Sequence, residues 1–293
     1  MNLSWIFGIL LLIHPINTKD SLSITKDGQI VSTFNRTELS IVSPDLKILD
    51  IDKFNRLLDQ LDKRYSIPPE NAVLDQYGNI VPERIGYQIY RQLFTEKFYS
   101  YFFKGSPSTM EIPMLFVYPK VDSELLGNIR TKRIGRYVTS FNGQNKERTN
   151  NIKLAAKAIN NFVLFPNETF SFNRVVGKRT AEKGYLRAPV IVRGEYSEDI
   201  GGGICQVSST LFNAVDNAGL KVLKRFSHSR KVSYIPPGRD ATVSWYGPDF
   251  SFKNVYNQPV LIRADILGNY LVIKIYSSDV VNYKPKKIPF PPY

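Results

Sequence analysis

The chain has 293 residues, of which 43 % are hydrophobic and 22 % charged, so a disordered chain is excluded and one large domain or two smaller ones are expected. One cysteine and two histidines exclude an internal disulfide framework, a cysteine-based zinc ribbon and a multi-histidine metal site. The formal net charge of +13 predicts an anionic partner or surface. We expect neither a metal nor a cofactor.

An apolar run over residues 5–13 opens the chain. It is shorter than the roughly 20 residues of a transmembrane helix, and its position favours the apolar core of an export signal. No Lys or Arg precedes it and Ile16–Thr18 is a poor cleavage site, so an uncleaved anchor and a short buried element remain alternatives. Removal of residues 1–20 would leave Cys205 and His228 as the single cysteine and histidine.

The segment after residue 20 predicts hairpins and a helix. Asp27 and Gly28 lie between two β-prone runs and predict a hairpin over 22–34. Apolar residues spaced i, i+3, i+4 and i+7 predict a helix over 51–65, which the following prolines stop. A second hairpin is expected over 72–81.

The next stretch predicts one helix, one strand and a linker. Residues 86–103 carry a heavy aromatic face and favour a helix. Residues 110–118 are β-prone, and Pro113 among them favours an edge strand. The polar stretch 122–136 is the best candidate for a linker between domains.

The second half predicts two helices among several strands. One helix spans 150–160, with Thr149 or Asn150 as its cap, and an amphipathic helix spans 206–218 and ends at Gly219. The expected strands cover 169–172, 188–193, 221–226, 241–245, 259–264 and 271–276. These elements predict the α+β class, with a mixed, mostly antiparallel sheet and a few helices.

Four segments follow from this reading. Residues 1–20 form the export signal or short anchor, and residues 21–125 form a smaller α/β N-terminal domain. Residues 126–280 form the second domain. Residues 281–293 form a basic, proline-rich tail that we expect to be solvated, with anionic wall polymers as a candidate contact.

The most informative motif is the glycine run Gly201, Gly202 and Gly203 before Cys205, at the start of the 206–218 helix. Glycines let the backbone approach a substrate closely, and a helix start offers free amides and a positive dipole end. A thiol placed there favours its thiolate, which is the nucleophile. The glycine amides, with the amide or side chain of Gln206, are candidate donors to an oxyanion.

A nucleophilic cysteine also needs a base, and His228 is the candidate. The helix travels about 20 Å at about 1.5 Å per residue, and a strand over 221–226 returns a similar distance. Asp240 and Asp249 are the candidates to orient the imidazole, and the order Cys, His, Asp suits papain-like chemistry. The alternative is a buried, structural Cys205 with a hydrogen-bonding His228.

The region from about Tyr137 to Tyr276 resembles the VanW domain, a family named after an accessory protein of vancomycin-resistance clusters. The matching segments are Thr139–Phe141, Arg148–Ile152, Phe165–Asn173, Val176-Gly177, Gly184-Tyr185, Gly201–Ser209, Arg225, His228-Ser229, Tyr234, Pro237–Thr242, Asp249 and Phe252–Asn254. Asn167 departs from the family's usual glycine. Residues 67–72, Gly78 and 81–86 resemble peptidoglycan-binding modules that precede such domains, with a generic α/β spacer as the alternative.

The resemblance implies a Gram-positive cell-wall protein. Some members of the family resemble LD-transpeptidases, so it implies that Cys205 attacks a stem peptide with His228 as base and forms 3→3 cross-links. The amides of Gly201–Gly203 would hold the oxyanion, and Arg225 or Arg239 would bind a stem carboxylate. The expected partners are peptidoglycan stem peptides. No nucleic acid is expected, and membrane contact only through the N-terminal segment.

Two alternatives stay open. One is a non-catalytic peptidoglycan-binding accessory protein in which Cys205 is a core residue. The other is a papain-like peptidoglycan peptidase, in which water replaces the acceptor amine. A sulfur within hydrogen-bonding reach of His228 favours an enzyme, and a buried sulfur far from His228 favours the binding protein.

Overall fold

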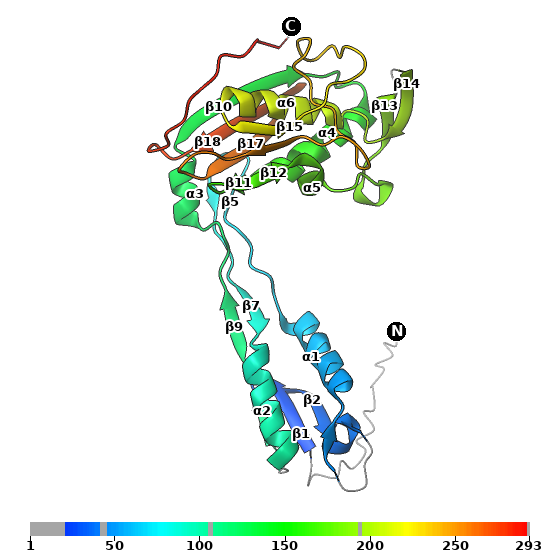
Figure 1. Ribbon diagram of the computed structural model, residues 1–293, viewed down its shortest axis with the longest axis vertical. Helices are drawn as coiled ribbons and strands as arrows, with labels where there is room; N and C mark the ends of the chain where they lie inside the picture. Colours follow the sequence, from blue (N-terminus) through cyan, green and yellow to red (C-terminus); the bar gives the residue numbers. More distant parts are fainter. Residues whose placement is uncertain (1–20, 42–45, 105–107, 193–194, 292–293) are drawn as a thin grey trace, which may run out of the picture. The chain divides into compact units, whose positions relative to one another are not determined.

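The computed structural model describes residues 21–41, 46–104, 108–192 and 195–291, without the side chains of 191–196 (Figure 1). The expected export segment lies outside these residues. The chain divides into two compact units. One runs to Glu70 and includes Arg84–Lys120, and the other comprises Asn71–Glu83 and Val121–Tyr293. None of the described helices has the length and apolar character to cross a membrane.

The N-terminal unit is a three-stranded sheet with two helices. Its strand order is β2 (Gln29–Asn35), β1 (Ser21–Lys26), β8 (Ser108–Glu111), with β1 antiparallel to β2 and parallel to β8. Helices α1 (Ile51–Tyr65) and α2 (Arg91–Lys104) share one aromatic core with this sheet. The hairpin predicted at Asp27-Gly28 and the helix predicted over 51–65 are confirmed.

Short elements complete this unit: η2 (Arg36–Leu39), the pair β3 (Ser40–Ile41) and β4 (Ile48–Leu49), and the pair β7 (Gly86–Ile89) and β9 (Met114–Val117). The helix predicted over 86–103 is therefore wrong at its start, because Gly86–Ile89 pairs with β9. The strand predicted over 110–118 is two strands. They separate near Pro113, whose ring nitrogen has no hydrogen to donate to a ladder.

The C-terminal unit is built on an antiparallel four-stranded sheet. Its order is β10 (Lys132–Ser140), β18 (Tyr270–Ser277), β17 (Val260–Leu267), β11 (Phe162–Leu164). Helices α4 (Lys146–Ile159) and α6 (Ile204–Asn217) pack against this sheet and against each other, and Figure 1 shows both over one face. The α+β prediction, with a mostly antiparallel sheet, is confirmed.

Smaller elements surround this layer. A second sheet joins β12 (Thr169–Ser171), β16 (Ser251–Lys253) and β15 (Lys221–Lys224). The remaining elements are the hairpin β13 (Arg187–Val192) and β14 (Glu195–Ile200), the pair β5 (Val73–Leu74) and β6 (Ile80–Val81), and the short helices α3 (Ser123–Ile129), α5 (Phe172–Val176) and η3 (Ala181–Lys183). The β13–β14 hairpin leads directly into the glycine run.

Three expectations for this unit are wrong. The stretch 122–136 is no linker: the Asp122 carboxylate accepts from the Leu125 amide at 2.7 Å and caps α3, and β10 follows. Asn145, rather than Thr149 or Asn150, caps α4. Residues 241–245 form no strand, because side chains of α6 bind this backbone instead of a neighbouring strand.

The domain division also differs from the expected boundary at 125/126, since the 72–81 hairpin belongs to the C-terminal unit. Its Ala72 and Leu74 pack with residues of α3 and with Leu261 in one buried cluster. Most residues of the basic tail are exposed, as expected, but its backbone is also bound at two points. The Lys286 amide donates to Asn217 O at 3.0 Å, and the Tyr137 hydroxyl donates to Pro289 O at 3.2 Å.

Candidate functional site

The glycine run forms the start of α6, as the sequence predicted, with Cys205 in its first turn. Gly203 is the N-cap with φ +103°, and Gly201 has φ +94°, a backbone region that residues with a Cβ adopt only under strain. At Gly202 a Cβ would lie 2.5 Å from Ala188 O on β13. Glycine is therefore required by both conformation and space, and Cys205 remains only partly buried.

The polar face of α6 binds the loop that carries Asp240. The Ser208 hydroxyl donates to Ala241 O at 2.5 Å, and the Ala241 amide donates to the Ser209 hydroxyl at 2.9 Å. One turn further along, Asn213 Nδ2 donates to Arg239 O at 2.8 Å. These side-chain bonds to the backbone hold Arg239 to Val243 alongside the first turns of the helix.

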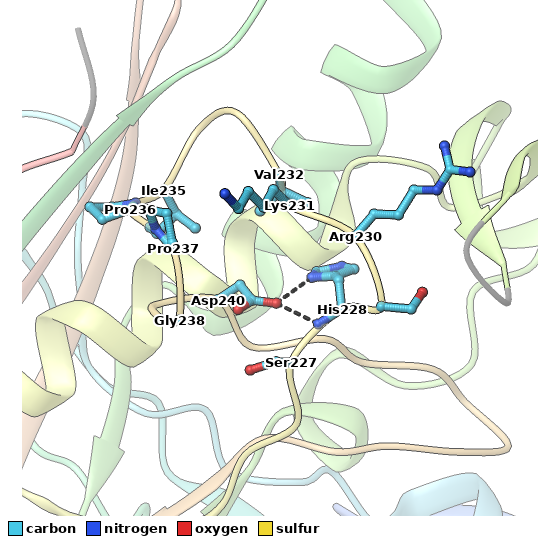
Figure 2. A pocket seen from close by; sticks show the side chains of 11 residues that line it. Ser227, His228, Arg230, Lys231, Val232, Ile235, Pro236, Pro237, Gly238 and Asp240 are labelled. Atoms are coloured by element: carbon cyan, nitrogen blue, oxygen red, sulfur yellow. Dashed lines mark hydrogen bonds and ion pairs between the residues drawn. The ribbon is translucent and has the colours of Figure 1, made fainter.

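His228 and Asp240 form a close pair in this loop. Their Nδ1 and Oδ2 atoms lie 2.7 Å apart, and the His228 amide donates to the same carboxylate oxygen at 2.5 Å. Figure 2 shows the Asp240 carboxylate directed at both the ring and the backbone of His228. Their side chains are only 7 % and 9 % exposed. The two bonds fix the orientation of the imidazole ring.

The Cys205 thiol is the third member of this group. The Val243 amide donates to its sulfur at 3.5 Å, and the Thr242 hydroxyl lies 3.7 Å away. Burial acts to raise the pKa of Cys205, but a hydrogen bond and the charge of His228 outweigh it, so the thiol pKa is lowered. Burial acts to lower the pKa of His228, and the bonds to Cys205 and Asp240 outweigh it, so the imidazole pKa is raised.

Burial also opposes ionisation of Asp240, but its two bonds to His228 lower the carboxyl pKa overall. The three shifts agree, since each favours the charged form of its group. The shift of each group toward its charged form is the direction expected for a cysteine nucleophile activated by a histidine and a carboxylate.

The predicted oxyanion donors are only partly available. The Gly201 amide donates to Leu186 O at 3.1 Å and the Gln206 amide to Gly203 O at 3.0 Å. The Gln206 side chain donates to Thr139 Oγ1 and to Ser140 O. Within the described residues, the amides of Gly202, Gly203 and Cys205 have no backbone partner outside the helix. These amides, and not Gln206, are the candidate donors.

The two arginines predicted to bind substrate are occupied within the protein. Arg225 donates to Asp240 O at 2.7 Å and to Gly238 O at 3.1 Å, which holds the Asp240 loop in place. Arg239 Nε donates to Asn213 Oδ1 at 2.8 Å, and its Nη2 lies 2.8 Å from Asp216. Their guanidinium groups stabilise the site through these contacts with the loop and with α6.

Asp249 lies apart from His228. Its carboxylate accepts from the Ser171 hydroxyl at 2.6 Å and from the Asn173 amide at 2.9 Å, at the start of α5. Of the two proposed orienting carboxylates, the structure therefore brings Asp240 to the imidazole and leaves Asp249 as a capping group.

Four residues near the thiol were not predicted as site residues: Arg148, Arg179, Tyr234 and Thr242. Arg148 and Arg179 interact electrostatically with the Cys205 sulfur, and Tyr234 does so from the loop before Asp240. Three of them lie inside segments that carry the family resemblance, so those segments held the signal. Arg179 follows Val176-Gly177 by two residues and carried no signal of its own.

A pocket of about 250 Å³ adjoins the His228–Asp240 pair, lined by the loop from Ser227 to Asp240 (Figure 2). Its lining combines the apolar Ile235, Pro236 and Pro237 with the basic Arg230 and Lys231. Within the part of the chain that the structure describes, no group of three His, Cys, Asp or Glu side chains is placed to hold a metal ion.

Comparisons with known proteins agree with the motif resemblance. The profile of a family described as "VanW like protein" matches residues 147–276, which include Cys205, His228 and Asp240. The uncharacterized protein YoaR of Bacillus subtilis is 55 % identical over 98 % of this chain and 95 % of its own length. The vancomycin B-type resistance protein VanW of Enterococcus faecalis is 34 % identical over 36 % of this chain and 40 % of its own. No solved structure matches.

Proposed function

The chain belongs to the VanW family, and we propose that it is an exported cell-wall enzyme whose Cys205 transfers acyl groups between peptidoglycan stem peptides. The observation that carries the proposal is that the loop with the buried His228–Asp240 pair also contacts the Cys205 sulfur through Thr242 and Val243, with a lowered thiol pKa and a raised imidazole pKa. A structural cysteine in a core needs no such partners.

The first half of the reaction forms a thioester. The Cys205 thiolate attacks the carbonyl carbon of the third stem residue, and the amides at the start of α6 hold the developing oxyanion. The carbon–nitrogen bond to the terminal D-Ala breaks, and the His228 imidazolium gives its proton to the leaving amine. D-Ala departs, and the acyl group remains on sulfur.

The second half transfers the acyl group. A side-chain amine of a neighbouring stem attacks the thioester carbonyl and gives a proton to the now neutral His228. The carbon–sulfur bond breaks, the thiolate is restored, and a 3→3 peptide cross-link is formed. Asp240 holds the imidazole orientation in both halves through its bond to Nδ1.

Cell-wall location is part of the same proposal. It is supported by the apolar run over residues 5–13, by the net charge of +13 and by the resistance-protein name of the VanW relative. The wall is rich in carboxylate and phosphate, which a basic protein binds.

The test is incubation of the purified chain with a disaccharide-tetrapeptide, with products identified by mass spectrometry. Wild type, Cys205→Ala and His228→Gln are compared. We expect a cross-linked dimer with wild type and none with either variant. A shortened monomer alone would identify a peptidase. Intact tetrapeptide that binds equally to all three proteins would identify a non-catalytic binding protein and contradict the proposal.

A further inference from the structure

Arg148 and Arg179 are two guanidiniums that interact electrostatically with the Cys205 sulfur, and neither forms a salt bridge with the residues that the structure describes. Arg148 lies in the first turn of α4 and donates from Nη2 to Gln206 Oε1 at 2.7 Å, and its guanidinium lies 5.9 Å from the Tyr234 ring centroid. Arg179 follows α5 and donates from Nη2 to Asn173 Oδ1 at 2.9 Å. Both bonds are to neutral amide oxygens, so neither positive charge is compensated by them.

The stems of both arginines lie against the glycine run. A Cβ on Gly203 would lie 2.8 Å from Arg148 Cγ, and one on Gly201 would lie 3.4 Å from Arg179 Cβ. The two side chains therefore flank the start of α6, where the unpaired amides and the positive dipole end also lie. The two guanidiniums and the positive end of the α6 dipole therefore all raise the electrostatic potential near Cys205.

Arg179 also has an unused donor. Its Nη1 atom is buried and bonds to none of the described residues. Asp249 interacts with this guanidinium electrostatically, but its carboxylate oxygens are bound by Ser171 and Asn173. A buried guanidinium donor without an acceptor is costly unless a ligand supplies one. A carboxylate is the acceptor whose geometry suits a guanidinium fork.

We propose that Arg148 and Arg179 form an anion subsite that binds the free carboxylate of the residue expelled from the acyl donor. This deepens the function proposed above and rests on it for the identity of the substrate. The subsite restricts donors to peptides in which the residue after the scissile bond is the last one. Arg225 and Arg239, which were expected to bind a carboxylate, already bond to groups of the protein itself. We therefore assign that role to Arg148 and Arg179.

The first test uses small probes and needs no turnover. Iodoacetate and iodoacetamide both alkylate a thiolate, but only iodoacetate carries a carboxylate. We expect the ratio of their rates at Cys205 to fall about tenfold in Arg179→Gln and in Arg148→Gln. Arg174→Gln is the matched control, since Arg174 is exposed and its guanidinium donates to Thr169 O.

A measurement on the wild-type protein covers the case of a variant that does not fold. The same rate ratio should decrease as NaCl is raised, because salt screens the attraction of the anion. Unchanged ratios in the variants, or in the wild type across the salt series, would overturn the subsite.

The second test compares a tetrapeptide donor with a C-terminal carboxylate and the same donor with a C-terminal carboxamide. We expect wild type to prefer the carboxylate by at least tenfold in kcat/KM, mainly through KM, and Arg179→Gln to lose this preference. Equal use of both donors by wild type would overturn the subsite while leaving acyl transfer intact. If iodoacetate reacts with Cys205 in the arginine-dependent way described above but neither peptide donor is turned over, the subsite is retained and the proposed function is overturned.

Discussion

Helices α1 and α6 have similar lengths but differ in which of their side chains are buried. In α1 the buried residues are Phe54, Leu57, Leu58 and Leu61, and the opposite face is exposed. In α6 every residue from Gln206 to Val215 is buried, including Ser208, Ser209, Thr210 and Asn213. The apolar face of α1 stabilises its unit, whereas the polar face of α6 binds a loop and positions a site.

The difference shows how a helix can organise chemistry without contributing most of the reacting groups. Only Cys205 comes from α6, yet Ser208, Ser209 and Asn213 fix the backbone that carries Asp240 and Val243. Matched substitutions in the two units test this division of roles, and each pair below contrasts one change near α6 with one in the N-terminal unit.

The largest contrast is expected between Asp240→Asn and Asp50→Asn. Loss of the Asp240 carboxylate removes the group that orients and charges His228, so turnover should fall by about 100-fold or more. Asp50 caps α1 by accepting from the Lys53 amide at 3.0 Å, and Asn caps equally well, so turnover and stability should be unchanged. Steady-state rates of product formation check both. Equal rates for Asp240→Asn and wild type would contradict the assignment.

The glycine run provides the next contrast. In Gly202→Ala the new methyl group meets the carbonyls of Ala188 and Pro189, and we expect a loss of about 2–3 kcal/mol of unfolding free energy. Gly28→Ala has open space around its Cβ and loses only about 1–2 kcal/mol, from its φ of +77°. Urea unfolding followed by circular dichroism measures both. A smaller loss for Gly202→Ala than for Gly28→Ala would show that the close approach is not required.

Polar side chains of the two helices should also differ in their contribution to stability. Ser209→Ala leaves the buried Ala241 amide without its acceptor and should cost about 1–3 kcal/mol. Gln60→Ala changes an exposed residue of α1 and should stay within about 0.5 kcal/mol of wild type. The same urea titrations apply. Equal losses of unfolding free energy in the two variants would show that the bond between Ser209 and the loop does not stabilise the protein.

The smallest effect concerns the pH dependence of thiol reactivity. Because the pKa of Cys205 is lowered, alkylation by neutral iodoacetamide should reach half its maximal rate below the ordinary thiol value. His228→Gln removes the hydrogen bond and the positive charge, so the midpoint should move to higher pH. Asp62→Asn, in α1, should leave it in place. If His228→Gln leaves the midpoint unchanged, His228 does not lower the pKa of Cys205 and the proposed thiolate–imidazolium pair is contradicted.

The sequence predicted the extent of α1 well because its apolar spacing is a local property. It also predicted Cys205 at a helix start, and it offered Asp240 and Asp249 as alternatives for the group beside His228. Long-range contacts decided between them: Ser171 and Asn173 bind Asp249, and α6 holds the loop of Asp240. Asn167, at the family's usual glycine position, has φ +66°, which explains why glycine is typical there.

The occupied arginines could not be predicted for the same reason. Arg225 donates to the backbone carbonyls of Gly238 and Asp240, and any residue can supply a carbonyl, so the sequence carries no signal for these bonds. Arg239 donates to the side-chain amide of Asn213 in α6, which is distant in the sequence. Arg148 and Arg179 come from different elements and meet only at the start of α6. Their common position depends on the packing of α4 against both α5 and α6, which brings Arg148 to Gly203 and Arg179 to Gly201.

The most direct test of the account is a search for the thioester itself. The purified chain is mixed with the disaccharide-tetrapeptide, quenched in acid within seconds, and analysed by intact-protein and peptide mass spectrometry. We predict an added mass equal to the donor without its terminal D-Ala, located on the peptide that contains Cys205 and absent from Cys205→Ala. Product formation without this adduct in wild type, and undiminished in Cys205→Ala, would contradict the account.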